Sequence, residues 1–180
     1  MILSDHEIIT EVENGNIVIE PFRREALGSN SYDVHLGKTL AIYDAVVLDA
    51  RQKNSVSCFD IPQDGFVLMP DKLYLGATME YTETHRHVPF LEGKSSVGRL
   101  GIDIHATAGK GDIGFKNFWT LEISARMPVR VYAGMPIGQI IYFEVKGDVL
   151  TPYDQKQSAK YNEVSPLPKE SQMWRNFSAG

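Results

Sequence analysis

Cysteine is almost absent from this sequence, because Cys58 is the only one among 180 residues. A single cysteine excludes an internal disulfide framework and fits a reducing compartment. It also excludes any zinc site that one chain would build from several cysteines. The chain must therefore rely on its apolar core for stability and on other side chains for any chemistry.

Long apolar runs and an excess of positive charge are also missing. No segment is apolar over the length that spans a bilayer, and the N-terminus has no basic, hydrophobic signal segment. The formal net charge of -5 argues against a surface that binds nucleic acid, because such surfaces are usually broadly basic. We expect a cytoplasmic protein with no nucleic-acid and no membrane partner.

The apolar content of 43% is enough for a core, and the length predicts one domain over residues 1–180. Ser4 and Glu7 form a capping box, which predicts an amphipathic helix over residues 4–13. Short apolar or alternating runs follow, and their spacing predicts a mostly β fold of the sandwich or barrel-like type. The expected strands cover residues 17–19, 32–36, 39–42, 46–48, 66–68, 73–78, 81, 102–105, 119–124, 129–132 and 137–143.

The five histidines do not outline a metal site. His85 and His87 are two residues apart, and no carboxylate stands at ligand spacing from His6, His35 or His105. A lone histidine is more often packed or exposed than bound to a metal. We predict no metal held by the protein side chains.

Residues 92–101, with the sequence EGKSSVGRLG, combine two cations, two hydroxyls and three glycines. Backbone N–H groups and small hydroxyls can approach phosphate oxygens in such a segment, and Lys94 and Arg99 add charge-assisted hydrogen bonds. Ser95 and Ser96 could open a short helix whose positive end faces the anion. The spacing matches neither a Walker A loop nor a dinucleotide-binding fingerprint, so an ordinary turn is the competing interpretation.

Glu122 stands in the strand that alternation predicts over residues 119–124. The apolar residues of that strand share one face, and Glu122 lies on the other between two hydroxyl residues. A glycine-dense turn, residues 107–115, precedes the strand. A solvated glutamate is the simpler interpretation, and a general acid and base is the alternative.

Several segments together resemble the dCTP deaminases of the trimeric dUTPase superfamily. The resemblance covers nearly the whole chain and implies a distorted jelly-roll or β-clip fold, dUTPase-like, with a short N-terminal helix. Its motifs are EGKSSVGRLG, HATAG, DIGF and TLE between Phe90 and Glu122, MILSD at residues 1–5, SYDVHLG at 31–37, AGMPIGQ at 133–139, and Tyr153 with residues 159–161.

This resemblance implies a role for each site residue. Glu122 would move protons between the attacking water, N3 of cytosine and the departing ammonia. The backbone carbonyl of Ala108 would orient that water, and Ser95 with Arg99 would complete the catalytic set. Thr120 and Leu121, with Glu122, would present groups to the pyrimidine edge. The nucleotide phosphates would be bound by Lys94, Ser95, Ser96 and Arg99, and Val97 and Gly98 would also contact the nucleotide.

The same resemblance assigns Asp112, Tyr153 and Lys160 as further nucleotide contacts. Residues 148–180 would form a lid that closes over the nucleotide and excludes water. The family often has a glutamine where this chain has Val164, which leaves base recognition by the lid open. Three chains are expected to associate as a homotrimer, with the phosphate loop and the base-reading strand of one site on different subunits.

The expected function is deamination of dCTP to dUTP and ammonia in pyrimidine deoxynucleotide metabolism. Mg²⁺ would arrive with the triphosphate, and zinc would take no part, because zinc-dependent deaminases need more cysteines. Gly109 resembles members that continue to dUMP and pyrophosphate, whereas Lys110 matches neither group, so this dual activity is the alternative.

Two other classes stay open. A plain dUTPase would share the fold but normally carries an Asp-bearing hairpin motif that this sequence lacks. A nucleotide-binding protein without activity is disfavoured by the intact Glu122, and a carbohydrate-binding sandwich by aromatic residues that gather in no single loop.

Overall fold

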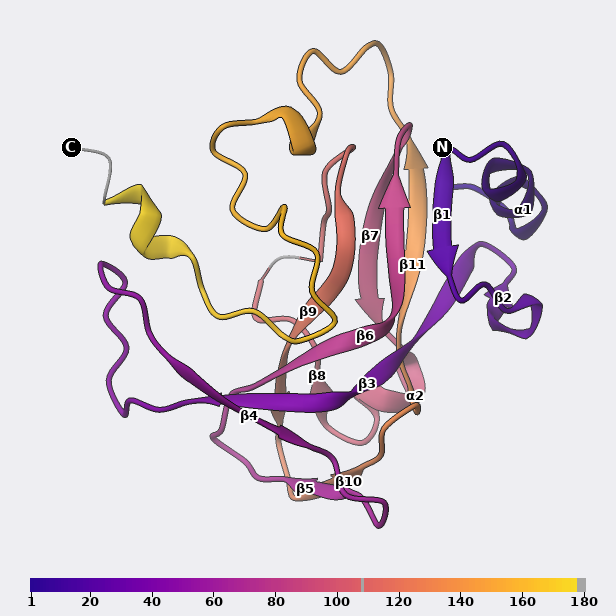
Figure 1. Cartoon of the computed structure of the whole chain (residues 1–180). Helices are drawn as coiled ribbons and strands as arrows, with labels where there is room; N and C mark the ends of the chain where they lie inside the picture. The colour runs from indigo at the N-terminus through magenta and orange to yellow at the C-terminus, as the bar shows by residue number, and fades with distance from the viewer. Residues whose placement is uncertain (108, 178–180) are drawn as a thin grey trace.

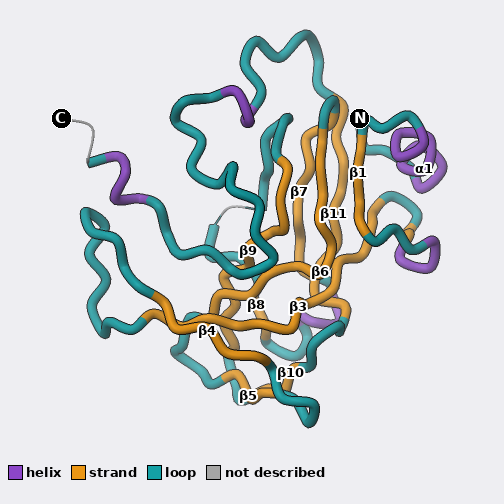
Figure 2. Tube along the Cα trace, in the orientation of Figure 1, coloured by secondary structure: helices purple, strands orange, loops and turns teal. Residues whose placement is uncertain are grey.

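Strands dominate the structure, as the residue pattern predicts. A computed structural model describes residues 1–107 and 109–177 and is drawn in Figures 1 and 2. The strands are β1 (Ile17–Glu20), β2 (Leu27–Gly28), β3 (Ser31–Tyr43), β4 (Val56–Asp60), β5 (Phe66–Leu68), β6 (Tyr74–Thr84), β7 (His87–Gly93), β8 (Ile102–Asp103), β9 (Lys116–Ala125), β10 (Val129–Val131) and β11 (Pro136–Glu144). The helical elements are α1 (Asp5–Glu13), α2 (Ser95–Gly98) and the 3-10 turns η1 (Arg24–Ala26), η2 (Tyr153–Gln155) and η3 (Met173–Asn176).

One antiparallel sheet carries most of the strands. Its order is β7-β11-β3-β6-β9-β8, with β1 added to β6, and with β2 and β4 added to β3. The long strands β3 and β6 bend, so that β4 lies across the lower part of the molecule while β1, β7 and β11 stand upright (Figure 1). A separate pair, β5 with β10, closes the lower end.

The bend of the sheet contains a buried carboxylate. The register shifts where β3 meets β6 and where β6 meets β9, and Glu80 lies at this irregularity with no exposed surface. Its carboxylate accepts the His35 backbone N–H at 2.9 Å, and its Oε1 lies 2.7 Å from His35 Nδ1. A buried charge needs such partners, so this pair links the two long strands at the point where they turn.

The apolar core lies between the curved layers of the sheet. Alternate residues of β9 face it, and the same alternation holds on β11. Together these strands and β3 bury large side chains almost completely. The largest fully buried side chains are Tyr32, Tyr142, Ile8, Ile17, Leu36, Leu40, Leu68, Leu91, Leu121, Ile123, Ile137 and Ile140.

Most predicted elements are confirmed, and some are wrong. The Ser4 side chain accepts the Glu7 N–H at 3.3 Å and caps α1, as the capping box predicts. The predicted strand over residues 46–48 is an exposed loop, because the packed strand of this hairpin is β4, which was not predicted. Strand β7 was also missed, and the strand predicted over 102–105 is only two residues long.

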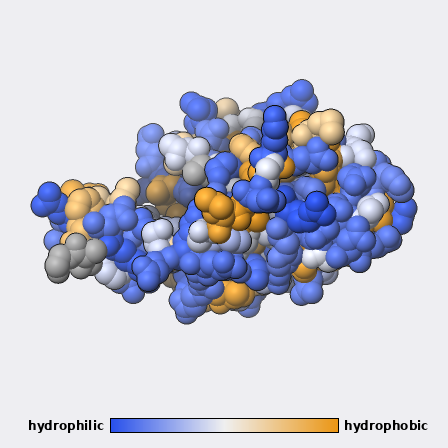
Figure 3. Space-filling model, turned by 90° about the horizontal axis from the view of Figure 1, so that it is seen from above, coloured by the Kyte–Doolittle hydropathy of each residue, from blue (hydrophilic) through white to orange (hydrophobic). Residues whose placement is uncertain are grey.

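The surface is largely polar, with small separate apolar areas (Figure 3). Near the C-terminus, η3 lies to one side of the strands (Figure 1). Within residues 1–107 and 109–177, no helix combines the length and the apolar character that crossing a membrane requires.

Helix α1 is joined to β7 by a buried hydrogen bond between two side chains. Glu11 is 8% exposed, and its Oε2 lies 2.5 Å from Nε2 of His87. Burial by itself raises the pKa of the Glu11 carboxyl, but the hydrogen bonds from His87 and Asn14 outweigh it and hold this pKa below its ordinary value. The pair therefore stabilises the fold while Glu11 is ionised.

We expect Glu11→Gln to weaken the fold at neutral pH and to flatten its response to acid. The folded-state pKa of Glu11 is lowered, so its contribution is present above the unfolded pKa and is lost as the pH falls through and below about 4. The loss at neutral pH should be about 2 kcal/mol, as for hydrogen bonds to charged groups. Thermal unfolding measured from pH 3 to pH 7 tests this, and parallel curves for both proteins would contradict it.

Candidate active site around Glu122

Strand β9 presents Glu122 as the alternation predicts. Its neighbours Leu121 and Ile123 are buried, whereas the Glu122 side chain keeps 35% of its surface exposed. The Glu122 backbone N–H donates to the Ile104 carbonyl at 3.0 Å, which joins the strand to the loop after β8. The carboxylate thus stands on the polar face of a rigid strand, beside that loop.

The loop supplies two groups to the carboxylate. The Ala106 backbone N–H donates to Oε2 of Glu122 at 3.3 Å. Nδ1 of His105 lies 3.5 Å from the same oxygen, its ring is largely buried, and neither ring nitrogen has a hydrogen-bond partner within residues 1–107 and 109–177. Ala108, which was expected to orient the attacking water, lies outside the described residues.

His105 and Ala106 were missed as residues that contact Glu122. In the sequence His105 is one of five histidines without ligand spacing, and the HATAG motif that contains it points only to the family resemblance. The signal was the glycine turn directly before the strand of Glu122. It could be recognised only by expecting the loop to fold back on that strand.

Two glycines let this loop pack against β7. The Leu91 N–H donates to the Gly109 carbonyl at 2.7 Å, and the Gly111 N–H donates to the Pro89 carbonyl at 2.8 Å. A Cβ atom on Gly109 would stand 2.4 Å from the Leu91 carbonyl oxygen. This close approach connects the loop beside Glu122 to the strand that leads into the predicted phosphate loop.

The predicted phosphate loop forms a single helical turn, α2, directly after β7. Val97 anchors the turn in the core with 3% exposure, whereas Ser95, Ser96 and Arg99 are exposed. The Lys94 ammonium pairs with the Asp33 carboxylate on β3. Both hydroxyls and one guanidinium therefore face outward together, available to an anion.

The two halves of the predicted site are separate within one chain. The first half is α2 with its exposed hydroxyls and Arg99, and it packs beside β8. The second half is Glu122 with the glycine loop. No hydrogen bond or ion pair links the two halves in the described part of the chain.

The Asp112 carboxylate forms ion pairs with two lysines. Its carboxylate lies 2.5 Å from the Lys110 ammonium and 3.4 Å from that of Lys156 in the C-terminal segment. The hydrogen bond from Lys110 and, more weakly, the charge of Lys156 outweigh burial and lower the pKa of the Asp112 carboxyl. Asp112 thus links the glycine loop to the segment after β11.

The C-terminal segment folds back over β9. The Tyr153 hydroxyl accepts the backbone N–H groups of Lys160 and Tyr161 at 3.2 and 3.1 Å. Thr120 on β9 accepts the Lys169 N–H through its hydroxyl at 3.1 Å. Tyr153 and Lys160 thus shape a turn of this segment, and the Thr120 side chain holds its later part next to the face of Glu122.

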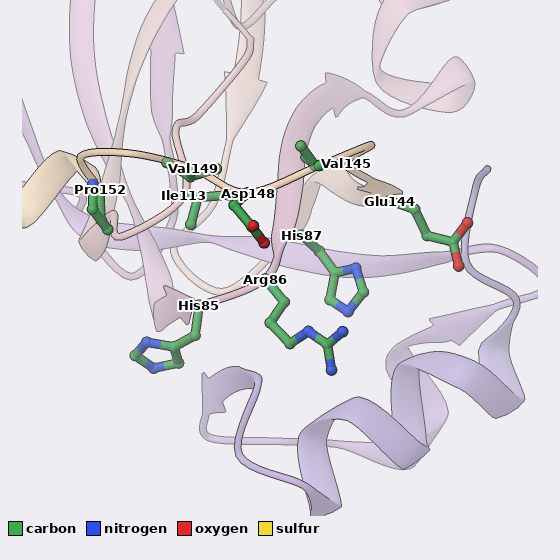
Figure 4. A pocket seen from close by; sticks show the side chains of 10 residues that line it. His85, Arg86, His87, Ile113, Glu144, Val145, Asp148, Val149 and Pro152 are labelled. Atoms are coloured by element: carbon green, nitrogen blue, oxygen red, sulfur yellow. The ribbon is translucent and has the colours of Figure 1, made fainter.

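A cavity of about 560 Å³ lies elsewhere, between the turn from β6 to β7 and the segment after β11 (Figure 4). None of the residues that the sequence assigns to nucleotide or catalysis lines it. The rings of His85 and His87 point to different sides of Arg86 (Figure 4). Over the described ranges, no group of three or more His, Cys, Asp or Glu side chains is arranged to hold a metal ion.

Comparison with known proteins decides the family. A family model described as dCTP deaminase-like matches residues 2–145. This chain belongs to that family. A relative from Clostridium acetobutylicum, named "dCTP deaminase, dUMP-forming", is 50% identical over 177 residues, which cover 98% of this chain and 99% of the relative. Relatives of the same name from Cytophaga hutchinsonii and Leptospira biflexa are 48% and 47% identical, with 98% of this chain and 99% and 98% of those relatives covered.

A solved structure supports the fold of this dCTP deaminase-like chain. The crystal structure of 2'-deoxycytidine 5'-triphosphate deaminase from Agrobacterium tumefaciens matches with a TM-score of 0.63 at 23% identity. The match covers 78% of this chain and 47% of that one. This match confirms the mostly β fold, and the family model with the near full-length relatives confirms the family that the motifs predict.

Proposed function

We propose that this protein deaminates dCTP and continues to dUMP, releasing ammonia and pyrophosphate. The observation that carries the proposal is Glu122, an ionisable side chain on a rigid strand with the Ala106 N–H and the His105 ring against one of its oxygens. The near full-length relatives named "dCTP deaminase, dUMP-forming" support dUMP, so we prefer the dual activity to the dUTP product expected first.

The first reaction is a hydrolytic addition and elimination at C4 of cytosine. Glu122 takes a proton from water as the water oxygen bonds to C4, and delivers protons to N3 and to the amino group. The C4–N4 bond then breaks, ammonia leaves and the uracil carbonyl forms. The Ala106 N–H holds the carboxylate in place during these transfers, because it donates to the oxygen that faces the loop.

The second reaction replaces the bond between the α- and β-phosphates by a bond to water, which gives dUMP and pyrophosphate. Ser95, Ser96 and Arg99 face outward on α2 and would bind the phosphate oxygens. Lys94 would join them by exchanging its Asp33 carboxylate for a phosphate. These hydroxyls and cations are poor ligands for Mg²⁺, so the ion fits this site as part of the nucleotide complex, where it neutralises phosphate charge.

A homotrimer would complete the site. Glu122 keeps about a third of its side chain exposed in one chain, and α2 makes no bond to it. General acid and base chemistry by a carboxylate works best where water is excluded. We propose that α2 of a neighbouring subunit faces Glu122 across the interface, in a cytoplasmic enzyme that acts on free nucleotide.

Parallel incubations with dCTP and with dUTP, each with Mg²⁺, test this function. Chromatography that resolves dUTP from dUMP should show dUMP as the final product from dCTP. Stoichiometric dUTP as the end product would favour deamination alone, and hydrolysis of dUTP with no change in dCTP would favour a plain dUTPase. Binding of either nucleotide without turnover would favour the non-enzymatic alternative.

A further inference from the structure

Asn117, near the start of β9, has its side chain completely used by hydrogen bonds to backbone groups. It is 4% exposed. Its Nδ2 donates to the carbonyls of Tyr161 and Glu163, each at 3.0 Å. Its Oδ1 accepts the N–H of Ser165 at 3.0 Å and that of Phe118 at 2.9 Å. Three of these four partners belong to the C-terminal segment.

The segment that Asn117 binds has no regular secondary structure. Residues 161–165 lie between η2 and η3 and belong to neither a strand nor a helix. Backbone groups that are removed from water need partners, and here one amide side chain supplies them for three residues. Asn117 therefore binds residues 161–165 in one particular backbone conformation.

The position of Asn117 on β9 determines which part of the sheet the segment covers. Strand β9 pairs with β6 on one side, and β8 joins its other side only at Ser124 and Ala125. The first residues of β9 therefore have no strand on that second side. The C-terminal segment passes this open edge and contacts both faces of β9. It contacts Asn117 on the apolar face and, through the Lys169 N–H, Thr120 on the face of Glu122.

One tyrosine of the docked segment links it to the residues that follow. The Tyr161 hydroxyl accepts the N–H of the buried Gln172 at 3.1 Å. Burial raises the pKa of this hydroxyl, and the charges of Tyr153, Tyr43 and Glu122 add smaller contributions, although the Gln172 N–H lowers it. The phenol therefore stays protonated and keeps its place in the segment.

We propose that Asn117 is a positioning residue that docks residues 161–169 on β9 and so holds the lid over Glu122. The docking itself follows from the contacts of the described residues, whereas its effect on turnover rests on the proposed deamination. Substrate entry then requires release of the docked segment, and its return excludes water from the reaction.

The variant Asn117→Ala tests the docking directly. It removes the three contacts to the segment, so hydrogen exchange at the Ser165 and Lys169 amides should accelerate about tenfold or more in the protein without nucleotide. Trypsin should cleave after Lys160 and Lys169 faster by a similar factor. Exchange at the Leu121 amide in β9 reports whether the core stays folded.

Two further variants sharpen the test. Asn117→Asp keeps the acceptor for Ser165 but turns an oxygen towards two carbonyls, so it should release the segment at least as much as Asn117→Ala. Asn162→Ala is the matched control, because this exposed asparagine lies in the same segment and makes no side-chain hydrogen bond in the described ranges. It should leave both exchange and cleavage unchanged.

The effect of Asn117 on turnover is measured separately from its effect on docking. For Asn117→Ala, kcat for ammonia release from dCTP should fall about tenfold, while the KM for dCTP changes less, because loss of a lid exposes the reacting groups to water. Unprotected Ser165 and Lys169 amides in the unaltered protein, or equal protection in Asn117→Ala, would overturn the docking. A released segment with unchanged kcat would overturn the positioning role. A protein that docks the segment but never deaminates dCTP would overturn the proposed function alone.

Discussion

Glu122→Gln is expected to lower ammonia release from dCTP about a thousandfold, which is within the range for loss of a general acid and base. Glutamine keeps the shape and can still contact the loop, but it cannot carry a proton between water and the base. Nucleotide affinity should stay within a few-fold, because no phosphate contact is removed. Single-turnover ammonia release and equilibrium binding of dCTP measure the two effects.

The control for this change is Glu83→Gln on β6. Glu83 accepts from the Tyr81 hydroxyl and pairs with His85, and in the described residues its side chain makes no hydrogen bond or ion pair with the glycine loop. Deamination should therefore be unaffected. Turnover by Glu122→Gln close to that of the unaltered protein would remove Glu122 from the mechanism.

Gly109→Ala is expected to displace the loop that contacts Glu122. The new Cβ would stand 2.4 Å from the Leu91 carbonyl oxygen, which belongs to β7 and cannot move freely. The loop must shift, so the Ala106 N–H and His105 lose their place at the carboxylate. We expect the fold to lose about 1–3 kcal/mol, as for other overpacked sites, and ammonia release to fall up to about a hundredfold.

Gly93→Ala is the matched control for that variant. Its added Cβ would meet only a side-chain carbon of Ile104 at 3.8 Å, an ordinary contact. Denaturant unfolding and ammonia release, measured on both variants, separate a steric effect at Gly109 from a general effect of losing a glycine. Equal behaviour of the two variants would contradict the close approach as the cause.

The sequence predicted those features that local physics determines. Alternation placed Glu122 on the polar face of β9, and the capping box located the start of α1 at Ser4. Strand β7 escaped prediction because its sequence HVPFLEG shows no alternation of apolar and polar residues, although its burial alternates once it pairs with β11. The exposed run at residues 46–48 was mistaken for a strand because three apolar residues in a row also form loops.

The site was predictable only in part. The motif residues of α2 and β9 were found by resemblance, and the structure adds what spacing cannot show. His105 reaches Glu122 because its loop folds back on β9. Asn117 is an ordinary asparagine in the sequence, and its function emerges only when a segment more than forty residues later returns to it. Such contacts depend on tertiary structure and leave no local pattern.

We expect one site, built around Glu122, to convert dCTP to dUMP. A time course with dCTP and Mg²⁺, in which ammonia, pyrophosphate, dUTP and dUMP are quantified together, tests it most directly. We predict ammonia and pyrophosphate in equal amounts, with dUMP rising to match both. Pyrophosphate without ammonia, or no ammonia above the enzyme-free control, would contradict it.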